Sequence, residues 1–476
     1  MYAAATLAAL VLSLTSTGDP PEWGGFRGNN GCGVASSKGI PEALDPEANI
    51  LWRTEVPDGY SSPIVAGENV FITGSEGSEL STVCLERYTG AVRWQTTLEF
   101  NGKRIGQNSP AAPTPVTDGE RLYVLFDAVG LLAYDMQGEE LWRAELGKIN
   151  IPHGLATSPL LHGDAVIVLV DQDRDAFLAA FDKNTGKELW RAERPGVTHG
   201  YSTPAIYTPE SGPAQVVVSG SLQIAAYSVT DGKKLWWVDG ASWQTKSVPV
   251  FAGGTCYVNA FMLPSSEFGV QTNDSWEEVL TKRDADGDGM VSKDEWDDET
   301  MRMLWPIFDL NDDGFLEHED YEYIQHSGSS SGGLFAIDMS GKGDVTASHV
   351  KWTFDDRRGL PDCPSPLLLD GQLYMIKEGG VMTAFDTASG EVSKQARVAE
   401  PDRYFASPVA AAGRIVTASV SGQLAVIATG SAGGDWEVLS VNNLDEEIWS
   451  TPAIAGEQVF VRTAKALYCF QSMQED

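Results

Sequence analysis

Carboxylate side chains recur at fixed intervals between residues 282 and 296, in the segment KRDADGDGMVSKDEW. If Asp284 is position one of a twelve-residue loop, side-chain oxygens occupy positions one, three, five, nine and twelve, and position seven supplies a backbone carbonyl. Gly289, at position six, permits the sharp turn that wraps such a loop around an ion. This spacing predicts a calcium site, because Ca²⁺ prefers several oxygen ligands in a flexible cage. The predicted ligands are Asp284, Asp286, Asp288, Met290 through its carbonyl, Ser292 and Glu295.

A second copy of the pattern begins 25 residues later and is less regular. Both copies match the loop of an EF-hand, and Gly314 again stands at position six. The second copy ends in aspartate where glutamate is usual. Because the shorter side chain reaches an ion less well, we expect weaker calcium binding or tolerance of magnesium there. Its predicted ligands are Asp309, Asn311, Asp313, Phe315 through its carbonyl, Glu317 and Asp320.

The two loops lie too close together for each to have two helices of its own. Residues 296–308 separate them and leave room for one shared helix, which Pro306 is expected to shorten. Residues 275–283 predict an entering helix capped by Ser275, and residues 318–325 predict an exit helix. Such a compressed pair has little room for the opening motion of a calcium sensor. We therefore expect a structural or weakly regulatory site.

These loops belong to a chain with a strongly negative charge. The formal charge is −34, and residues 267–322 contain 19 Asp and Glu against 4 Lys and Arg. Nucleic acids and anionic membrane surfaces would repel such a chain, so neither is an expected partner. The clustered carboxylates should also repel one another unless a cation binds between them.

The first residues of the sequence carry an export pattern. An apolar run at residues 3–14, too short to span a bilayer, is followed by small and polar residues and predicts a secretory signal over residues 1–18. We therefore expect an exported protein of the periplasm, cell envelope or extracellular space. No other segment is long and apolar enough to cross a membrane. The five cysteines are scattered without the spacing of a zinc site or a disulfide framework.

A small residue before proline marks a repeat that the acidic segment interrupts. The intervals between these prolines are 52, 44, 45, 45, 117, 42 and 44 residues, and the long interval contains both loops. Without the excess in that interval, eight units of similar length remain. The residues before proline are Ser62, Thr114, Ser158, Thr203, Val248, Ser365, Ser407 and Thr451.

Each unit predicts four short strands separated by turns, and the last strand usually begins near a tryptophan. Four strands at this spacing are typical of a propeller blade, so the predicted fold class is all-β, an eight-bladed β-propeller, with seven blades as the alternative. The last unit lacks a fourth strand, which residues 50–56 can supply by closing the ring. We expect tryptophans to pack between blades: Trp52, Trp94, Trp142, Trp190, Trp236, Trp352 and Trp436.

The expected organisation of the chain follows from these patterns. After the signal at residues 1–18 comes an N-terminal extension at residues 19–49. Blades one to four and the first part of blade five occupy residues 50–264, the EF-hand insert residues 265–330, and the rest of blade five with blades six to eight residues 331–476.

The repeat resembles a known one. The segments AFDKNTGKELW and LAYDMQGEELW are similar to the PQQ-like propeller repeat, which quinoprotein alcohol dehydrogenases share with the BamB family. The segments WGGFRGNNGCGV and HGYSTPA resemble a bacterial, largely exported group of BamB-like propellers. This resemblance covers residues 50–471 apart from the insert, and it implies the fold more strongly than the function.

The resemblance raises the question of a quinone cofactor. Quinoprotein dehydrogenases place two adjacent cysteines over the quinone and hold a central calcium with Glu, Asn and Asp beside a catalytic Asp. This chain has no adjacent cysteines and no stretch that matches those motifs, which argues against PQQ. The HExxH and GxxxxGK[ST] patterns are absent as well. We therefore assign no catalytic or cofactor-binding residue.

Loop residues near the starts of the units are candidates for a binding surface. His153 and His199 each precede a glycine, where each is either a hydrogen-bonded loop histidine or part of the face of the propeller. Tyr201, Trp243 and Tyr404 are positioned to shape a funnel for a ligand or peptide.

Together these patterns predict a monomeric, exported, calcium-binding and non-enzymatic propeller that acts as a scaffold for a protein or peptide partner. Two alternatives stay open. One is a PQQ-dependent quinoprotein dehydrogenase, and the other is a BamB-like outer-membrane protein assembly factor that binds extended peptides.

Overall fold

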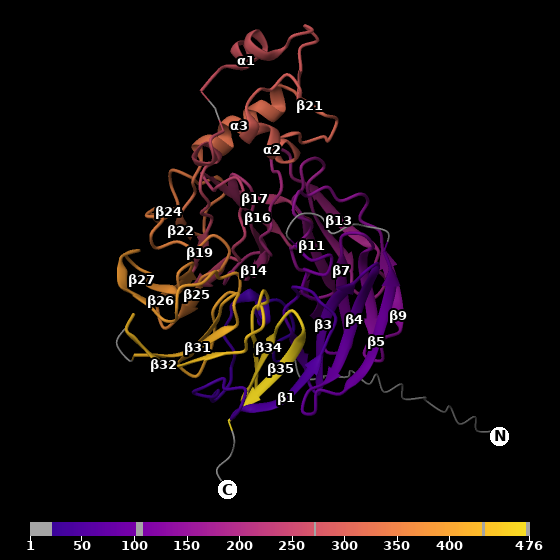
Figure 1. Ribbon diagram of the computed structural model, residues 1–476, viewed down its shortest axis with the longest axis vertical. Coiled ribbons are helices and arrows are strands. Elements are labelled where there is room, and N and C mark those ends of the chain that lie inside the picture. Colours follow the sequence, from indigo (N-terminus) through magenta and orange to yellow (C-terminus); the bar gives the residue numbers. More distant parts are fainter. Residues whose placement is uncertain (1–20, 101–107, 271–272, 431–433, 473–476) are drawn as a thin grey trace, which may run out of the picture.

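The strands in the described part of the chain form eight small, mainly antiparallel sheets arranged as the blades of a propeller, and one short two-stranded ladder outside the ring (Figure 1). The computed structural model describes residues 21–100, 108–270, 273–430 and 434–472. The eight-bladed prediction is confirmed and the seven-bladed alternative is wrong. The predicted signal at residues 1–18 lies outside the described residues. No helix in the described ranges combines the length and apolarity needed to cross a bilayer.

Blades 1 to 4 follow one another along the chain. Their second and third strands are buried on both faces, because each sheet packs between two others, whereas the outermost strands alternate exposed and half-buried residues. Blade 1 comprises β2 (Ile64–Ala66), β3 (Asn69–Glu76), β4 (Glu79–Glu86) and β5 (Val92–Glu99); blade 2 comprises β6 (Val116–Thr117), β7 (Arg121–Phe126), β8 (Gly130–Asp135) and β9 (Glu140–Ala144); blade 3 comprises β10 (Leu160–His162), β11 (Ala165–Val170), β12 (Phe177–Asp182) and β13 (Glu188–Glu193); blade 4 comprises β14 (Ala205–Tyr207), β15 (Gln215–Ser219), β16 (Gln223–Ser228) and β17 (Lys234–Asp239).

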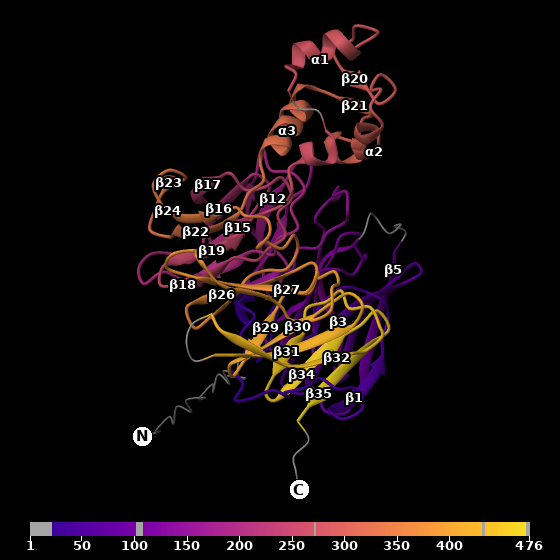
Figure 2. The same cartoon turned by 60° about the vertical axis from the view of Figure 1, so that its left-hand side comes forward.

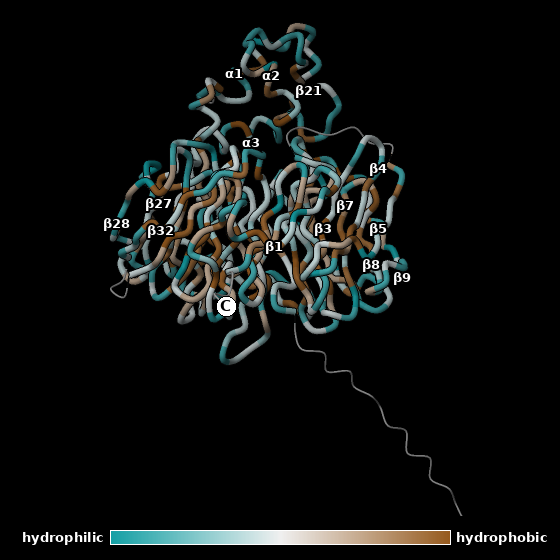
Figure 3. Tube along the Cα trace, turned by 60° about the horizontal axis from the view of Figure 1, so that its bottom comes forward, coloured by the Kyte–Doolittle hydropathy of each residue, from teal (hydrophilic) through white to brown (hydrophobic). Residues whose placement is uncertain are grey.

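Blades 5 to 8 complete the ring, and blade 5 contains the insert between its second and third strands. Figure 3 shows hydrophobic segments concentrated in the strands and hydrophilic segments at the turns and in much of the insert. Blade 5 comprises β18 (Val250–Ala252), β19 (Thr255–Asn259), β22 (Leu334–Asp338) and β24 (Val350–Phe354); blade 6 comprises β25 (Leu367–Leu369), β26 (Gln372–Lys377), β27 (Val381–Asp386) and β28 (Val392–Arg397); blade 7 comprises β29 (Val409–Ala411), β30 (Arg414–Ala418), β31 (Gln423–Thr429) and β32 (Trp436–Asn443); blade 8 comprises β33 (Ala453–Ala455), β34 (Gln458–Arg462), β35 (Ala466–Gln471) and β1 (Ile50–Glu55).

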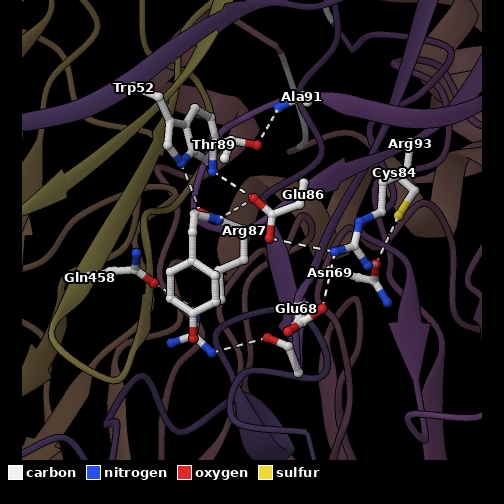
Figure 4. A network of polar contacts seen from close by, with 12 residues as sticks. Trp52, Glu68, Asn69, Cys84, Glu86, Arg87, Thr89, Ala91, Arg93 and Gln458 are labelled. Carbon is white, nitrogen blue, oxygen red and sulfur yellow. Dashed lines mark hydrogen bonds and ion pairs between the residues drawn. The ribbon is translucent and has the colours of Figure 1, made fainter.

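The ring closes through the predicted orphan strand. β1 pairs antiparallel with β35, so Thr54 lies opposite Leu467. Figure 4 shows the junction between this last blade and blade 1. There the indole Nε1 of Trp52 donates to the Arg87 carbonyl at 2.8 Å, and Nε of Arg87 donates to Oε1 of Gln458 at 2.7 Å. Strand pairing and side-chain bonds together join residues from the two ends of the chain.

Among the described residues, tryptophans dock five blades onto the next, as predicted, whereas Trp436 of blade 7 packs on Tyr374 of the preceding blade. In blade 2, Trp142 Nε1 donates to the Lys183 carbonyl in the last turn of blade 3 at 3.0 Å. The ring lies against Gly186 of that turn, where a Cβ atom would stand 2.5 Å from Trp142 Cε3. The corresponding bond is made by Trp52, Trp94, Trp190 and Trp352.

Trp236 departs from this arrangement, although it is buried as predicted. Its Nε1 donates to Oε1 of Gln215 in its own blade at 2.9 Å. The reason is a longer turn in blade 5, which contains the short strand β23 (Gly343–Asp344). This strand runs parallel to β17 and places Gly343 opposite Trp236.

The N-terminal extension crosses one end of the propeller. Trp23 bridges to Val65 in blade 1, and Val34 bridges to Ala410 in blade 7. Between them, in the 3-10 turn η1 (Asn29–Gly31), the Asn30 amide exchanges two hydrogen bonds of 2.6 Å with the backbone of Ile206 in blade 4. Because these blades lie on different sides of the ring, the segment covers the propeller axis at this end.

The insert projects from the opposite end (Figures 1 and 2). Ser275 caps the first helix with a capping box, as predicted. The expectation that Pro306 shortens the shared helix is wrong: the helix begins after the Asp298 cap and continues to Phe308, because Trp305 and Phe308 in its last turn are buried. The elements of the insert are η2 (Ser265–Phe268), α1 (Trp276–Arg283), β20 (Val291–Ser292), α2 (Glu299–Phe308), β21 (Phe315–Leu316) and α3 (His318–Ser329).

Candidate metal centre and central cavity

The first predicted loop brings three carboxylates together beside α1, at the tip of the insert (Figure 2). Oxygens of Asp284, Asp286 and Glu295 all lie within 4.8 Å of one another. Across the described ranges this is the one group of three or more acidic, histidine or cysteine side chains close enough to share an ion. Asp286 is exposed and the other two are partly buried. Hard oxygen donors in this number fit a calcium ion that completes its shell with carbonyl, hydroxyl or water oxygens.

Backbone N–H groups hold these carboxylates in position. Asp284 accepts from Gly287 at 2.7 Å and from Gly289 at 3.0 Å. Both glycines have positive φ, 77° and 87°, which turns their N–H groups toward the carboxylate. Glu295 accepts from the Ser292 N–H at 2.7 Å and from its hydroxyl at 2.8 Å. These bonds lower the pKa of Glu295, so its carboxyl group is ionised at neutral pH.

The remaining predicted ligands of this loop lie beside the cluster. The Asp288 carboxylate accepts the N–H of Met290 at 2.9 Å, and Met290 directly precedes β20. The structure therefore brings together the predicted ligands Asp284, Asp286 and Glu295 at positions one, three and twelve. Ser292, at position nine, hydrogen-bonds to Glu295.

The second loop repeats these contacts in a more buried setting. Asp309 accepts from Gly314 at 2.8 Å. Asp320, at position twelve, accepts from the N–H groups of Leu310 at 3.1 Å and Glu317 at 2.8 Å. In the first loop, position twelve accepts from the same two positions, two and nine. Asp320 is fully buried, and this burial, with the nearby Asp309 charge, raises its pKa to about 6.

Other predicted ligands of the second loop are occupied by protein partners. The Asn311 amide donates to the Asp313 carboxylate at 2.8 Å, and Asp313 in turn accepts the N–H of Phe315 at 2.9 Å. The Glu317 carboxylate lies 3.7 Å from Arg174 of blade 3. The second loop thus contacts the propeller, whereas the first one is further out.

The two loops are joined by a short antiparallel ladder. Val291 of β20 lies opposite Leu316 of β21, and both are position eight of their loops. Below this ladder, α2 serves as the exit helix of the first loop and the entry helix of the second, as predicted. The pairing joins the backbones of the two loops.

The base of the insert packs on the loops of blades 3 and 4. Phe308 of α2 stacks on Trp243 with ring centroids 6.0 Å apart. The Tyr323 hydroxyl of α3 lies 3.3 Å from both the Trp243 carbonyl and Nε2 of His199. Nδ1 of His199 lies 2.6 Å from the Asp173 carboxylate. His199 is therefore a hydrogen-bonded buried histidine, and Trp243 supports the insert, so its expected place in a funnel is wrong.

The residues before proline form a ring of hydrogen bonds around the propeller axis. The N–H of each donates to the hydroxyl of its counterpart in the next blade, as from Ser158 to Thr203 at 3.0 Å. The ring passes from the last blade to the first, from Thr451 to Ser62, at 3.0 Å. It is interrupted after Thr203, because Val248 has no hydroxyl. The accepting hydroxyls are those of Ser62, Thr114, Ser158, Thr203, Ser365, Ser407 and Thr451.

A cavity of about 350 Å³ lies on the axis, and all seven hydroxyl residues line it. Phe26, from the segment that crosses the far end, and Met262, from the base of the insert, line it as well. Of the predicted funnel residues, Tyr201 lines the cavity, as does His153, but Tyr404 is buried in the core of blades 6 and 7. The small residue before each proline was the sequence signal for this ring, although its role was not predicted.

One hydrolase-like sequence pattern is present but has no catalytic geometry. Residues 328–332, GSSSG, fit the letters GxSxG of hydrolases with Ser330 at the centre. In those enzymes the serine follows a strand and precedes a helix. Here it follows α3 and precedes β22, the reverse order.

Several solved structures share this fold. BamB from Moraxella catarrhalis superposes with a TM-score of 0.53 at 13% identity, covering 89% of this chain and 99% of that chain. A europium-containing methanol dehydrogenase gives 0.59 at 12% identity, over 94% of this chain and 98% of that chain. A quinohemoprotein alcohol dehydrogenase from Comamonas testosteroni superposes with a TM-score of 0.60 at 11% identity, covering 96% of this chain and 82% of that chain. At such identities the likeness establishes the fold alone.

Sequence comparison is more specific. The outer membrane protein assembly factor BamB of Burkholderia pseudomallei (strain K96243) is 26% identical over 236 residues, 46% of this chain. The match spans 55% of that protein's length. The profile of the family described as outer membrane protein assembly factor BamB matches residues 82–237, 174–288 and 310–475. Because these matches cover more than half of the chain and the repeats form eight blades, the chain belongs to the BamB family of PQQ-like propellers.

Proposed function

We propose that this protein is a calcium-binding, non-enzymatic propeller of the cell envelope that serves as a scaffold for protein partners. The observation that carries the calcium half is the equivalence of the two loops. In each loop, the carboxylate at position one accepts a hydrogen bond from the backbone N–H at position six. The carboxylate at position twelve accepts from the backbone N–H groups at positions two and nine. Two loops with different burial share this arrangement, which supports a common design for binding an ion.

The first loop is the stronger calcium site of the pair. Asp284, Asp286, Asp288 and Glu295 supply the charge, and the Met290 carbonyl and Ser292 hydroxyl complete the predicted set. A cation there offsets the mutual repulsion of the carboxylates. We expect a dissociation constant on the order of 10⁻⁴ to 10⁻³ M, typical of extracellular modules. The second loop binds calcium more weakly, with tolerance of magnesium, because Asp320 is short and buried.

Isothermal titration calorimetry with calcium tests this assignment. Glu295→Gln keeps the shape of the side chain but removes its charge, and it should weaken calcium binding by about tenfold or more. Asp294→Asn is the matched control, since the adjacent Asp294 side chain is 97% exposed and faces away from the cluster toward Arg302. Absence of calcium binding by the unmodified protein, or equal effects of both substitutions, would show that the loop is not a calcium site.

The scaffold half of the proposal rests on family membership and on the outer strands of the blades. The name of the curated relative, outer membrane protein assembly factor, supports an envelope location and outer-membrane proteins as partners, and we infer that such a partner binds as an extended peptide. An outermost strand can pair with such a peptide along its edge. These strands also present exposed apolar side chains that can contact it, namely Val92, Leu141, Leu189, Val392, Val438, Leu439 and Val441.

Binding of an unfolded outer-membrane β-barrel precursor, measured by biolayer interferometry, tests this partner class. We expect saturable binding that Leu189→Arg weakens about fivefold or more, because a charge replaces an exposed apolar contact at the rim. His162→Arg, on the innermost strand of the same blade, is the control. A precursor that does not bind would refute the assembly role and leave the calcium assignment intact.

A further inference from the structure

The seven ring hydroxyls have hydrogens left to donate. Each hydroxyl oxygen already accepts a backbone N–H, and a Ser or Thr hydroxyl has one O–H donor in addition. Within the described part of the chain, none of the seven donates to a protein acceptor. All seven residues line the cavity. The O–H groups of seven blades therefore converge on one space around the axis.

Other polar groups that line the cavity lack a protein partner too. These are the Tyr201 hydroxyl, Nε2 of Gln244 and Nδ1 of His153, considering the described residues. Tyr201 is 8% exposed and Gln244 is 3% exposed. Buried polar groups are nearly always hydrogen-bonded, and the hydroxyls and the Gln244 amide are donors, so their surplus indicates a ligand that carries several oxygen acceptors.

The charges around the cavity favour a neutral ligand. Lys246, the one Lys or Arg among the described lining residues, donates to the Asp362 carboxylate at 2.6 Å, and the two charges offset each other. Burial lowers the pKa of His153, so its imidazole is uncharged at neutral pH. The formal charge of −34 on the whole chain also opposes the entry of a polyanion.

An aromatic wall borders the cavity on the side of blades 1, 7 and 8. Trp449 stacks on Tyr60 with ring centroids 5.0 Å apart and contacts Phe405 at 4.8 Å. All three rings line the cavity and are partly exposed. Aromatic faces suit the C–H faces of a sugar ring, while hydroxyl and amide donors suit its oxygens. The cavity volume of about 350 Å³ suits one or two such rings.

We propose that the central cavity binds a neutral saccharide of one or two rings. The ring hydroxyls and the Gln244 amide donate to its oxygens, and the aromatic wall, which Trp449 holds together between Tyr60 and Phe405, packs against its apolar face. This site uses none of the residues assigned to calcium and none of the outer strands assigned to a protein partner. The saccharide proposal can therefore be tested independently of the function proposed above.

Calorimetry and saturation-transfer NMR on the full chain in calcium test the proposal. The neutral panel is glucose, galactose, mannose, N-acetylglucosamine, maltose and cellobiose. The anionic panel is gluconate, phosphate and pyrroloquinoline quinone. We expect at least one neutral sugar to bind with one-to-one stoichiometry. Failure of the whole neutral panel up to about 20 mM, or binding of anions only, overturns the proposal.

Variants locate the binding in the cavity. Trp449→Ala and Gln244→Leu should each weaken binding about tenfold or more. Thr203→Val removes one hydroxyl without changing the shape of the side chain, and Val248 shows that the ring accommodates valine. Thr417→Val is the control, because this buried hydroxyl on β30 lies away from the cavity lining. Sugar binding that none of the three cavity variants weakens would place the site elsewhere and refute the assignment.

Discussion

At the scale of single residues, Val248 is the irregular member of the inner ring. It stands where seven other blades have a hydroxyl, so the N–H of Thr203 has no acceptor among the described residues. Valine packs instead on the N-terminal segment: a Cβ atom at Gly31 would lie 2.8 Å from Val248 Cγ1. The position thus exchanges a hydrogen bond between blades for a contact with the segment that crosses the axis.

This exchange predicts the effect of restoring the hydroxyl. Val248→Thr has nearly the same shape and supplies an acceptor to the N–H of Thr203. It should raise the free energy of unfolding by about 1 kcal/mol, measured by urea denaturation. Val248→Ala should lower it, because packing is lost and no acceptor is gained. A threonine variant no more stable than the natural protein would show that Thr203 has no unmet hydrogen bond.

At the scale of elements, the contact between a tryptophan and the last turn of the next blade holds neighbouring sheets together. The turn must present a glycine for two reasons. Gly186 has φ of 70°, and the Trp142 ring leaves no space for a side chain above it. Gly163, in the first turn of the same blade, has φ of 58° but no atom within 4 Å of its Cβ position.

The pair of glycines separates backbone strain from packing. Gly163→Ala should cost only the strain of a positive φ, about 1 kcal/mol. Gly186→Ala should lower the free energy of unfolding by that amount and by about 1–3 kcal/mol more, because the Trp142 ring must move. Thermal unfolding of both variants checks the difference. Equal losses of stability would mean that the tryptophan can shift freely and does not fix the spacing of the blades.

At the scale of the whole molecule, the insert has two parts with different surroundings. Its base shares a buried aromatic cluster with the propeller, including Trp243, Phe308 and Tyr323. Its tip carries the first loop, whose carboxylates are close together and are exposed or only partly buried. Removal of a bound cation therefore acts on the tip, while the base stays docked by apolar packing.

Hydrogen–deuterium exchange with calcium and then with chelator tests this division. Chelator should increase exchange in α1, the first loop and β20, because carboxylate repulsion returns there. α3 and the blades should stay protected. Glu295→Gln should show the faster exchange even in calcium, and Asp294→Asn should not. Faster exchange throughout blades 3 to 5 would instead mean that the ion stabilises the propeller itself.

Much of the architecture followed from local patterns. The proline spacing predicted the number of blades and Ser275 predicted a helix start, because both signals lie in neighbouring residues. The closure joins distant strands, and it was predicted because the last unit lacks the fourth strand that residues 50–56 supply. The prediction at Pro306 failed for the opposite reason. Loss of one N–H was outweighed by burial of Trp305 and Phe308, which no local pattern reveals.

The sequence by itself determined the repeat, the blade count and the spacing of the oxygen-bearing residues in both loops, since these are properties of neighbours along the chain. Only the tertiary structure decided that the residues before proline form a ring around a cavity. It also decided that the N-terminal segment covers the axis and that Trp243 supports the insert. Ser62 and Thr451 are 389 residues apart and meet because eight similar sheets close on themselves. Contacts of this range depend on how the blades pack, which the repeat pattern leaves open.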